Sequence, residues 1–249
     1  MRLLFLGIKP CSTVGTNNLH TVSLDWITPD AERIVASHAR VSTKNPYRDE
    51  SVRLLRYCIK HGHWSVFEQV CASFEIVTTR AISPQILRHR SFTFQEASQR
   101  YCDPLDVLEG VVEDVPYFEL RAQDLKNRQN SSAFEDQALI ERTFRDRILH
   151  LFEESQQLYK DLLQAGVAKE CARNALLMCV PTRLHMMGTL RSWIFYIGLR
   201  AAPGTQYEHR VIAQQIGNSL GSQLPIIKEA IFDSQREATN PALDGWRYV

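Results

Sequence analysis

Apolar positions recur at helical spacing in the N-terminal third of this 249-residue chain. Ile34 and Val35 follow Pro29-Asp30 in a segment that predicts a helix ending near residue 42. A second group of apolar residues falls on one side of residues 49–61, and Gly62 stands where helices commonly end. Two short helices are therefore expected before residue 62.

Two stretches have the composition of strands. Residues 67–80 are rich in Val, Phe, Ile and Thr and form the best predicted strand, while Pro181–Leu190 is a second candidate. The apolar opening Met1–Ile8 is very short and lacks a small-residue cleavage site, so it predicts a first strand rather than a signal peptide.

Helical patterns dominate the rest of the chain. Pro84 lies early in a predicted short helix, and residues 102–118 predict an irregular connection. Ser132-x-x-Glu135 is a capping box, which predicts a helix from there towards Gly166. Further helices are expected over residues 168–178 and 190–236.

These elements predict an α+β fold with a central, mostly antiparallel sheet flanked by helical lobes. The chain contains no internal repeat, low-complexity tract or linker, so residues 1–249 are expected to form a single domain.

Composition narrows the class of protein. The chain is 44% hydrophobic and 23% charged, as is usual for globular proteins. It has no apolar run of the roughly 18 residues that a membrane span needs. Six cysteines without a CxxC pair indicate reduced thiols in a cytoplasmic protein. The net charge of +1 excludes a bulk polybasic nucleic-acid binder.

The distribution of arginine is more informative than the net charge. Of the 29 basic residues, 22 are arginine, and seven of these fall in two windows that contain no acidic residue and no lysine. The windows run from Glu75 to Glu96 and from Glu170 to Glu208. A half-buried guanidinium cannot lose its proton, so it needs an anion. Either distant segments supply carboxylates, or the side chains extend to water, or an anionic, phosphorylated ligand binds there. The ligand is our working hypothesis.

Residues 88–101 concentrate hydrogen-bonding groups: Arg88-His89-Arg90 is followed, after seven residues, by Ser98, and then by Arg100-Tyr101. This pattern resembles the signature of the flavin-dependent thymidylate synthases. The segment from His61 to Glu68 is similar to a second motif of that family. Downstream, Arg173 and Arg200 have the family's spacing of 27, and Gln206-x-Glu208 follows. The resemblance covers roughly residues 30–230.

The resemblance implies methylation of dUMP at C5 to give dTMP, without a cysteine nucleophile. Methylenetetrahydrofolate would donate the carbon, NADPH would be the reductant, and FAD would be the redox carrier. It also implies a homotetramer with shared active sites and no nucleic-acid or membrane partner. A non-catalytic nucleotide- or RNA-binding module that uses the same arginines and aromatics is the competing hypothesis.

By resemblance, the catalytic residues are Arg200, which would face the uracil, and His63. The positions that match FAD ligands are Ser65, Arg88, His89, Arg90, Glu96, Thr189 and Arg191. The positions that match dUMP ligands are Gln85, Arg88, Glu96, Ala97, Ser98, Gln99, Arg100, Arg173 and Arg200. Arg173 would bind the phosphate. Arg80 and Arg183 receive no role.

Several local alternatives bear on these assignments. Ser98 lacks a GxSxG elbow, so hydrogen bonding to dUMP is favoured over nucleophilic attack. His61-x-His63 lacks further ligands at metal-binding spacing, so no metal is expected. The chain has no GxGxxG or GxxxxGK phosphate loop. Gln69, Thr189 and Gly204 depart from residues common in the family, and the last two positions bear on the FAD contacts.

Overall fold

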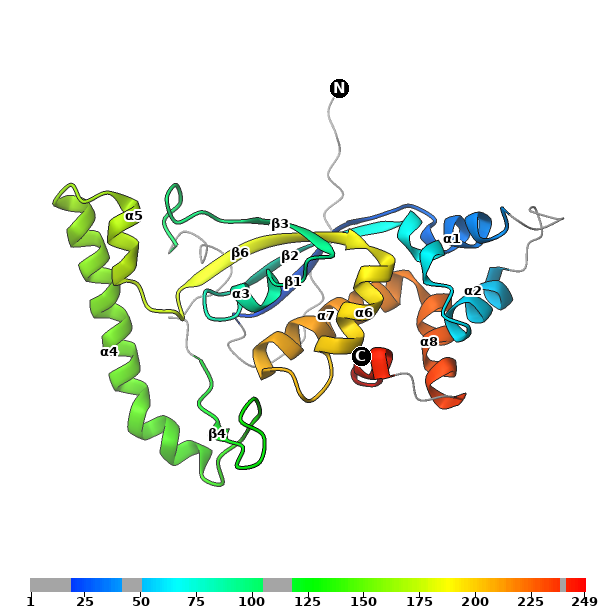
Figure 1. Ribbon diagram of the computed structural model, residues 1–249. Helices are drawn as coiled ribbons and strands as arrows, with labels where there is room; N and C mark the ends of the chain where they lie inside the picture. The colour runs from blue at the N-terminus through cyan, green and yellow to red at the C-terminus, as the bar shows by residue number, and fades with distance from the viewer. Residues whose placement is uncertain (1–18, 42–50, 105–117, 238–240) are drawn as a thin grey trace.

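The computed structural model describes residues 19–41, 51–104, 118–237 and 241–249. A central sheet lies between a lobe formed by α1 and α2 at one end and a lobe formed by α4 and α5 at the other (Figure 1). The strands are β1 (Thr21–Ile27), β2 (Cys71–Thr79), β3 (Phe92–Glu96), β4 (Ala122–Gln123), β5 (Ser131–Ser132) and β6 (Pro181–Thr189). The α-helices are α1 (Ala31–Ala39), α2 (Ser51–Lys60), α3 (Ser83–Ile86), α4 (Gln137–Gln164), α5 (Lys169–Ala172), α6 (Leu190–Arg200), α7 (Tyr207–Gln223) and α8 (Pro225–Glu237). The 3₁₀ helices are η1 (Trp64–Gln69), η3 (Arg173–Ala175) and η4 (Pro241–Tyr248).

The main sheet has four strands in the order β1-β2-β6-β3, and every neighbouring pair is antiparallel. Its centre is the pairing of β2 with β6, which runs in register from Cys71 opposite Thr189 to Thr79 opposite Pro181. The predicted α+β class, the antiparallel sheet and the strand at 181–190 are therefore confirmed.

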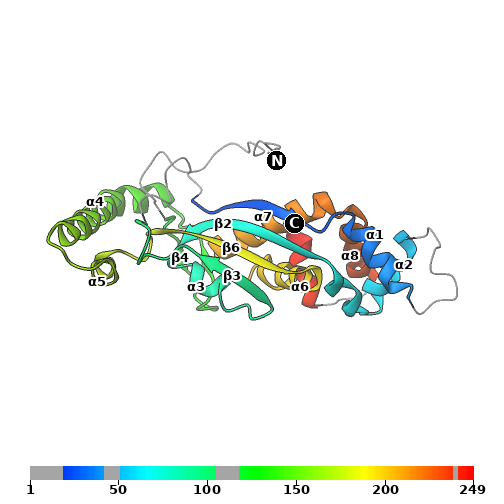
Figure 2. The same ribbon diagram turned by 90° about the horizontal axis from the view of Figure 1, so that it is seen from above.

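Helices cover one face of this sheet. Figure 2 looks down on the strands, with α6 and α7 behind them. On the covered face, Phe74 of β2 and Met186 of β6 are fully buried, and the Phe74 ring meets Trp193 of α6 edge to face at 5.0 Å. The other face carries polar side chains, among which His185 lies 2.8 Å from a carboxylate oxygen of Asp25.

Helix α6 is buried on most of its surface, because the sheet, α7 and η4 all pack against it. Its contact with η4 is so close that a Cβ built on Gly198 would lie 2.0 Å from the carbonyl oxygen of Ala242. A Cβ built on Gly245 of η4 would likewise lie 2.1 Å from the carbonyl oxygen of Ile197. Trp246 stabilises the contact, because its Nε1–H donates a hydrogen bond to the carbonyl oxygen of Ile194 at 2.9 Å. This packing fixes where α6 ends.

Three predictions about secondary structure were wrong in detail. Ser131 and Ser132 pair with β4, so the capping box does not open α4. Asp136 is the N-cap instead, and its carboxylate accepts from the backbone N–H of Leu139 at 2.9 Å. The beginning of the predicted strand 67–80 belongs to η1, and the edge strands β1 and β3 were not predicted.

The other helices lie close to their predicted positions, and Gly62 and Gly166 both have positive φ at helix ends. The predicted strand Met1–Ile8 and most of the connection 102–118 lie outside the described residues. Within the described part of the chain, no helix has the length and apolarity to cross a membrane. The five cysteines found there are all unpaired.

We expect Gly198→Ala to lower the free energy of unfolding by about 2 kcal/mol or more, because the clash is with backbone that cannot rotate away. Chemical denaturation of the variant and the parent checks this. Gly204→Ala is the matched control, since a Cβ there has nothing within 4 Å. Equal stability of the parent and Gly198→Ala would contradict the packing of α6 against η4.

Candidate functional site

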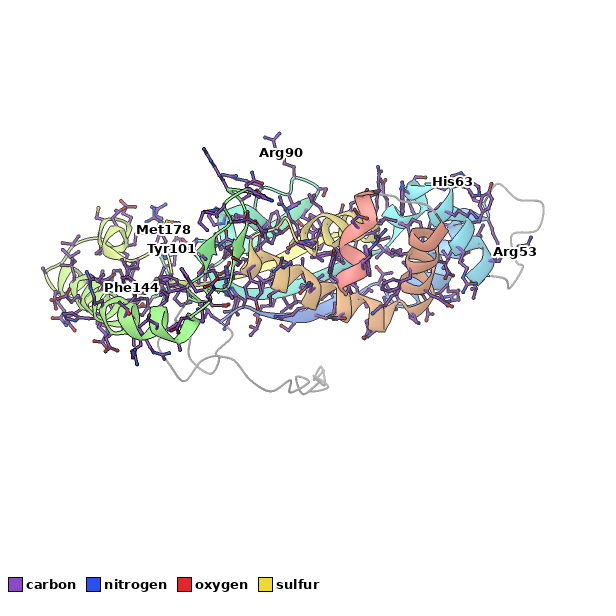
Figure 3. The ribbon with its side chains drawn as sticks, turned by 90° about the horizontal axis from the view of Figure 1, so that it is seen from below. Arg53, His63, Arg90, Tyr101, Phe144 and Met178 are labelled. Atoms are coloured by element: carbon purple, nitrogen blue, oxygen red, sulfur yellow. The ribbon has the colours of Figure 1, made fainter. Side chains whose placement is uncertain are left out.

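The turn between α3 and β3 carries Arg88, His89 and Arg90. Backbone hydrogen bonds from His89 to Ile86, at 3.1 Å, and from Phe92 to His89, at 3.2 Å, shape this turn. Arg88 and Arg90 are exposed, and Arg90 projects from the surface in Figure 3. Neither arginine pairs with a carboxylate among the described residues. The turn thus presents two free guanidinium groups to solvent.

His89 is turned inward from the same segment and meets the last residue of α6. The Nε–H of Arg200 donates to Nε2 of His89 at 2.9 Å. Because Nε2 accepts, the imidazole must be neutral and carry its proton on Nδ1. Burial and the neighbouring Arg200 charge lower the pKa of His89 to about 4, which keeps it neutral at physiological pH.

Two more buried polar side chains lie behind His89. The hydroxyl of Tyr196 is 3.1 Å from Nε2 of His209, and the Tyr196 ring meets His89 at 4.9 Å. Burial first, and then electrostatic interaction with Arg200 and with His89, lower the pKa of His209 to about 3. Burial raises the pKa of Tyr196. Arg200 is therefore a half-buried cation beside three side chains, His89, Tyr196 and His209, that stay uncharged.

Glu96, at the end of β3, has its carboxylate occupied by protein groups. Arg80 pairs with it at 2.8 Å, and hydroxyls of Ser83 and Thr182 donate to its other oxygen. Arg80 also donates to the carbonyl of Ala97 at 2.7 Å. Arg80, which the sequence left without a role, thus holds the end of β3 in place.

The end of the signature lies near α5. Ser98 begins a turn in which its carbonyl accepts from the backbone N–H groups of Tyr101 and Cys102 at 3.0 and 2.9 Å. Arg100 pairs with Glu170 of α5 at 3.1 Å. Arg173, which opens η3, is exposed and has no carboxylate partner among the described residues. The ion pair with Glu170 thus brings Arg100 to the α5 end of the molecule, where Arg173 also lies.

His63 and Ser65 lie at the opposite end. Figure 3 shows His63 far from Tyr101 and Met178, and its ring is 5.5 Å from that of Tyr57. Ser65 lines a cavity of about 460 Å³ together with His38, Val41, Val66 and Gln69. His61 and His63 are neighbours, but the described residues contain no cluster of three or more groups that could hold a metal.

The acid-free windows divide into two sets of arginines. Arg80, Arg183 and Arg191 pair with the carboxylates of Glu96, Glu75 and Glu68, so distant segments do supply anions to these three. Arg88, Arg90, Arg173 and Arg200 have no carboxylate partner in the part of the chain that is described. Only the second set carries positive charge that no described carboxylate neutralises, as a bound anion requires.

Thr189 and Gln85 have clear local partners. Thr189 is the N-cap of α6, and its hydroxyl accepts from the N–H of Ser192 at 3.3 Å. Gln85 donates from Nε2 to Oε1 of Gln206 at 2.6 Å. Gln206 in turn donates to Glu208 at 3.0 Å. Gln85 is therefore tied to the start of α7, six residues beyond Arg200 along the chain.

The sequence analysis missed three contributors to this region. Tyr196 and His209 look like core residues, and only the distance between them reveals the pair. Arg121 pairs with Glu208 at 2.5 Å, but in sequence it stands beside Glu119, with which it also pairs at 3.3 Å. A local acid partner therefore concealed its long-range one.

Comparison with known proteins identifies the relatives of the chain. Residues 24–226 match the family model Thy1, described as thymidylate synthase complementing protein. A flavin-dependent thymidylate synthase of Synechocystis sp. is 43% identical over 200 residues, covering 80% of this chain and 89% of that one. A probable flavin-dependent thymidylate synthase of Paramecium bursaria Chlorella virus 1 is 42% identical over 205 residues, with 81% and 90% covered.

A solved structure has the same fold. The UMP/dUMP methylase PolB from Streptomyces cacaoi, bound with 5-Br dUMP, superposes with a TM-score of 0.68 at 22% sequence identity. The match covers 86% of this chain and 95% of that one.

We expect the stability of the protein to fall as the pH drops from 6.5 towards 4. Histidines in the unfolded chain take up protons near pH 6.5, whereas folded His89 and His209 stay neutral to about pH 4 and 3. Their contribution is complete above pH 6.5 and is lost as the pH falls. For His209 alone, the loss between pH 7 and 5 is about 2 kcal/mol. Urea unfolding at the two pH values measures it.

His209→Gln should shrink this difference between pH 7 and 5, because one of the two histidines no longer titrates. His150→Gln is the matched control, since His150 lies exposed on α4. An unchanged pH dependence in His209→Gln would show that His209 is not held neutral by the fold.

Proposed function

The chain belongs to the family of flavin-dependent thymidylate synthases, and we propose from this premise that it methylates dUMP at C5 to form dTMP. Methylenetetrahydrofolate supplies the carbon, FAD is the cofactor, and NADPH is the reductant. The observation that carries the proposal is Arg200: a half-buried guanidinium held by neutral His89, without a carboxylate among the described residues. Such a cation is prepared for the negative charge that develops on a uracil ring.

The residues of the α3–β3 turn fit FAD. FAD carries a diphosphate, and the free guanidiniums of Arg88 and Arg90 match two phosphate groups in charge and geometry. His89 has its Nδ1–H available as a further donor, because Nε2 is engaged by Arg200. When bound, the flavin supplies the redox chemistry that amino-acid side chains lack.

Three other residues proposed to bind FAD have surroundings in the protein that limit how each could contact the cofactor. Ser65 lines a cavity at the α1 end, which can receive part of a cofactor. Arg191 is paired with Glu68, so it would contact FAD while keeping that partner. Thr189 uses its hydroxyl to cap α6, and it therefore supports the FAD site through the start of that helix.

We assign dUMP to two groups of residues. Arg200, Arg88 and Gln85 would surround the uracil and sugar. Arg173 would bind the phosphate, together with the turn formed by Ala97, Ser98, Gln99 and Arg100. The carboxylate of Glu96, which was predicted to bind dUMP and FAD, is engaged by Arg80, Ser83 and Thr182, so we assign Glu96 to shaping this turn. His63 is proposed to act near the flavin and the folate.

These groups lie at separate places along one chain, so we propose that the active site forms between copies in a homotetramer. Gln85 and Arg200 belong to the centre of the molecule, Arg100 and Arg173 to the α5 end, and His63 to the α1 end. Helix α4 supports this assembly because it exposes apolar side chains that need covering. These are Leu139, Phe144, Leu151 and Leu158, and Figure 3 shows Phe144 on the surface.

The same proposal includes a single domain over residues 1–249 and a cytoplasmic location. It includes no metal and no nucleic-acid partner. We favour this proposal over the RNA-binding hypothesis, because Arg80 and Arg183 form ion pairs with Glu96 and Glu75 and therefore do not contribute to a basic surface.

We expect the purified protein, supplied with FAD, NADPH and methylenetetrahydrofolate, to release tritium from C5-labelled dUMP. Arg200→Ala should lower this release by at least about a hundredfold, because the charge facing the uracil is lost. Its flavin absorbance should be retained. Arg128→Ala, at an exposed position between β4 and β5, is the comparison variant. Absence of both flavin binding and tritium release in the parent protein would refute the proposal.

Shared sites make a second prediction. Arg173→Ala and Arg200→Ala should each be inactive alone, but mixing them under conditions of subunit exchange should restore activity. Some sites would then receive an intact Arg173 from one copy and an intact Arg200 from another. Tritium release before and after mixing measures this, and light scattering gives the mass of the assembly. No recovery in a tetramer with proven exchange would place both arginines of each site on one chain.

A further inference from the structure

A line of hydrogen bonds connects Gln85 to an ion pair that no catalytic role explains. Gln85 Nε2 donates to Gln206 Oε1 at 2.6 Å, and Gln206 Nε2 donates to Glu208 Oε2 at 3.0 Å. The second carboxylate oxygen of Glu208 accepts from Arg121 at 2.5 Å. Four side chains from α3, the start of α7 and the segment before β4 thus form one continuous relay.

The ion pair at the end of the relay is well held. Only 11% of the Arg121 side chain and 13% of the Glu208 side chain are exposed. Arg121 also donates to Ser131 at 2.9 Å and lies over the ring of Tyr207 at 4.5 Å. Burial alone would raise the pKa of Glu208, but the hydrogen bond from Arg121, with smaller contributions including one from Gln206, leaves it below its ordinary value. Glu208 therefore remains a carboxylate.

The charge on Glu208 determines the direction of every bond in the relay. A carboxylate can only accept hydrogen bonds, whereas an amide side chain has one donating and one accepting end. Gln206 must turn its NH₂ group to Glu208, so its oxygen faces Gln85. Gln85 must then turn its NH₂ group to Gln206. The oxygen Oε1 of Gln85 is left without a hydrogen bond from any described residue.

We propose that Arg121, Glu208 and Gln206 are positioning residues that present Gln85 to the nucleotide as a hydrogen-bond acceptor. The subsite then selects a ligand group with an N–H or O–H, such as N3 of the uracil or the 3′-hydroxyl of the sugar, and disfavours an acceptor there. This inference rests on the proposed function, in which Gln85 contacts dUMP.

Glu208→Gln tests the relay with little change in shape. A carboxamide at position 208 can donate as well as accept, so Gln206 and Gln85 are no longer held in one orientation. Arg121 keeps Ser131 and Glu119 as partners. Gln206→Leu breaks the relay at its middle. Gln223→Leu is the matched control, because Gln223 is an exposed amide at the other end of α7.

The measurement is calorimetric binding of dUMP, N3-methyl-dUMP and 2′,3′-dideoxy-UMP to the FAD-loaded protein. The two analogues each lack one candidate donor. Wild type and Gln223→Leu should bind one analogue about tenfold more weakly than dUMP, the size expected for one lost hydrogen bond. In Glu208→Gln and Gln206→Leu, the difference in affinity between dUMP and that analogue should shrink to about threefold or less. Thermal melting should show that both variants are folded.

Two results would overturn the inference. One is a wild-type protein that binds all three nucleotides equally. The other is a difference in affinity between dUMP and the analogue that stays the same in the two variants. This includes the case in which the affinities for all three nucleotides fall together, because that pattern indicates a merely structural role. A wild-type protein that does not bind dUMP would instead refute the proposed function, and the inference with it.

Discussion

Guanidinium keeps its positive charge when it is withdrawn from water, and the centre of this molecule is organised around that constraint at Arg200. Its one described hydrogen bond goes to an imidazole that burial keeps neutral. Behind it, the Tyr196 hydroxyl and Nε2 of His209 are hydrogen-bonded to each other, and both side chains stay uncharged. The close contact of α6 with η4 sets where this cation lies, so core packing and electrostatics depend on the same helix.

The fold was predictable from the sequence where burial was complete. Strands β2 and β6 are covered by neighbours on both edges, so their β-branched and apolar runs were recognisable. Edge strands β1 and β3 alternate exposed and half-buried positions, which weakens the pattern. The start of α4 was misplaced because Ser132 and Asp136 are both good N-caps, and only pairing with β4 removes Ser132 from the helix.

The candidate site was predictable as a set of residues but not as an arrangement. The signature of residues 88–101 identified Arg88 and His89, and the spacing of 27 residues from Arg173 identified Arg200. The ion pairs could not be inferred, because Arg191 and Glu68 are 123 residues apart in sequence. The pairing of Arg121 with Glu208 was hidden because Glu119, two residues away in sequence, offers a local partner. Stretches of sequence without acidic residues therefore indicate which arginines need an anion, while the fold determines which of them pair with a protein carboxylate.

The position of β3 has a consequence for inheritance. This strand separates the Arg88–Arg90 turn from the Ser98–Arg100 turn by five paired residues, or about 16 Å. In the proposed homotetramer, a rigid spacer of that length would let one 14-residue signature contribute to two different active sites. A defective copy of the gene would then impair sites completed by healthy subunits, so mutations in this segment would behave as partly dominant in a cell that makes both forms.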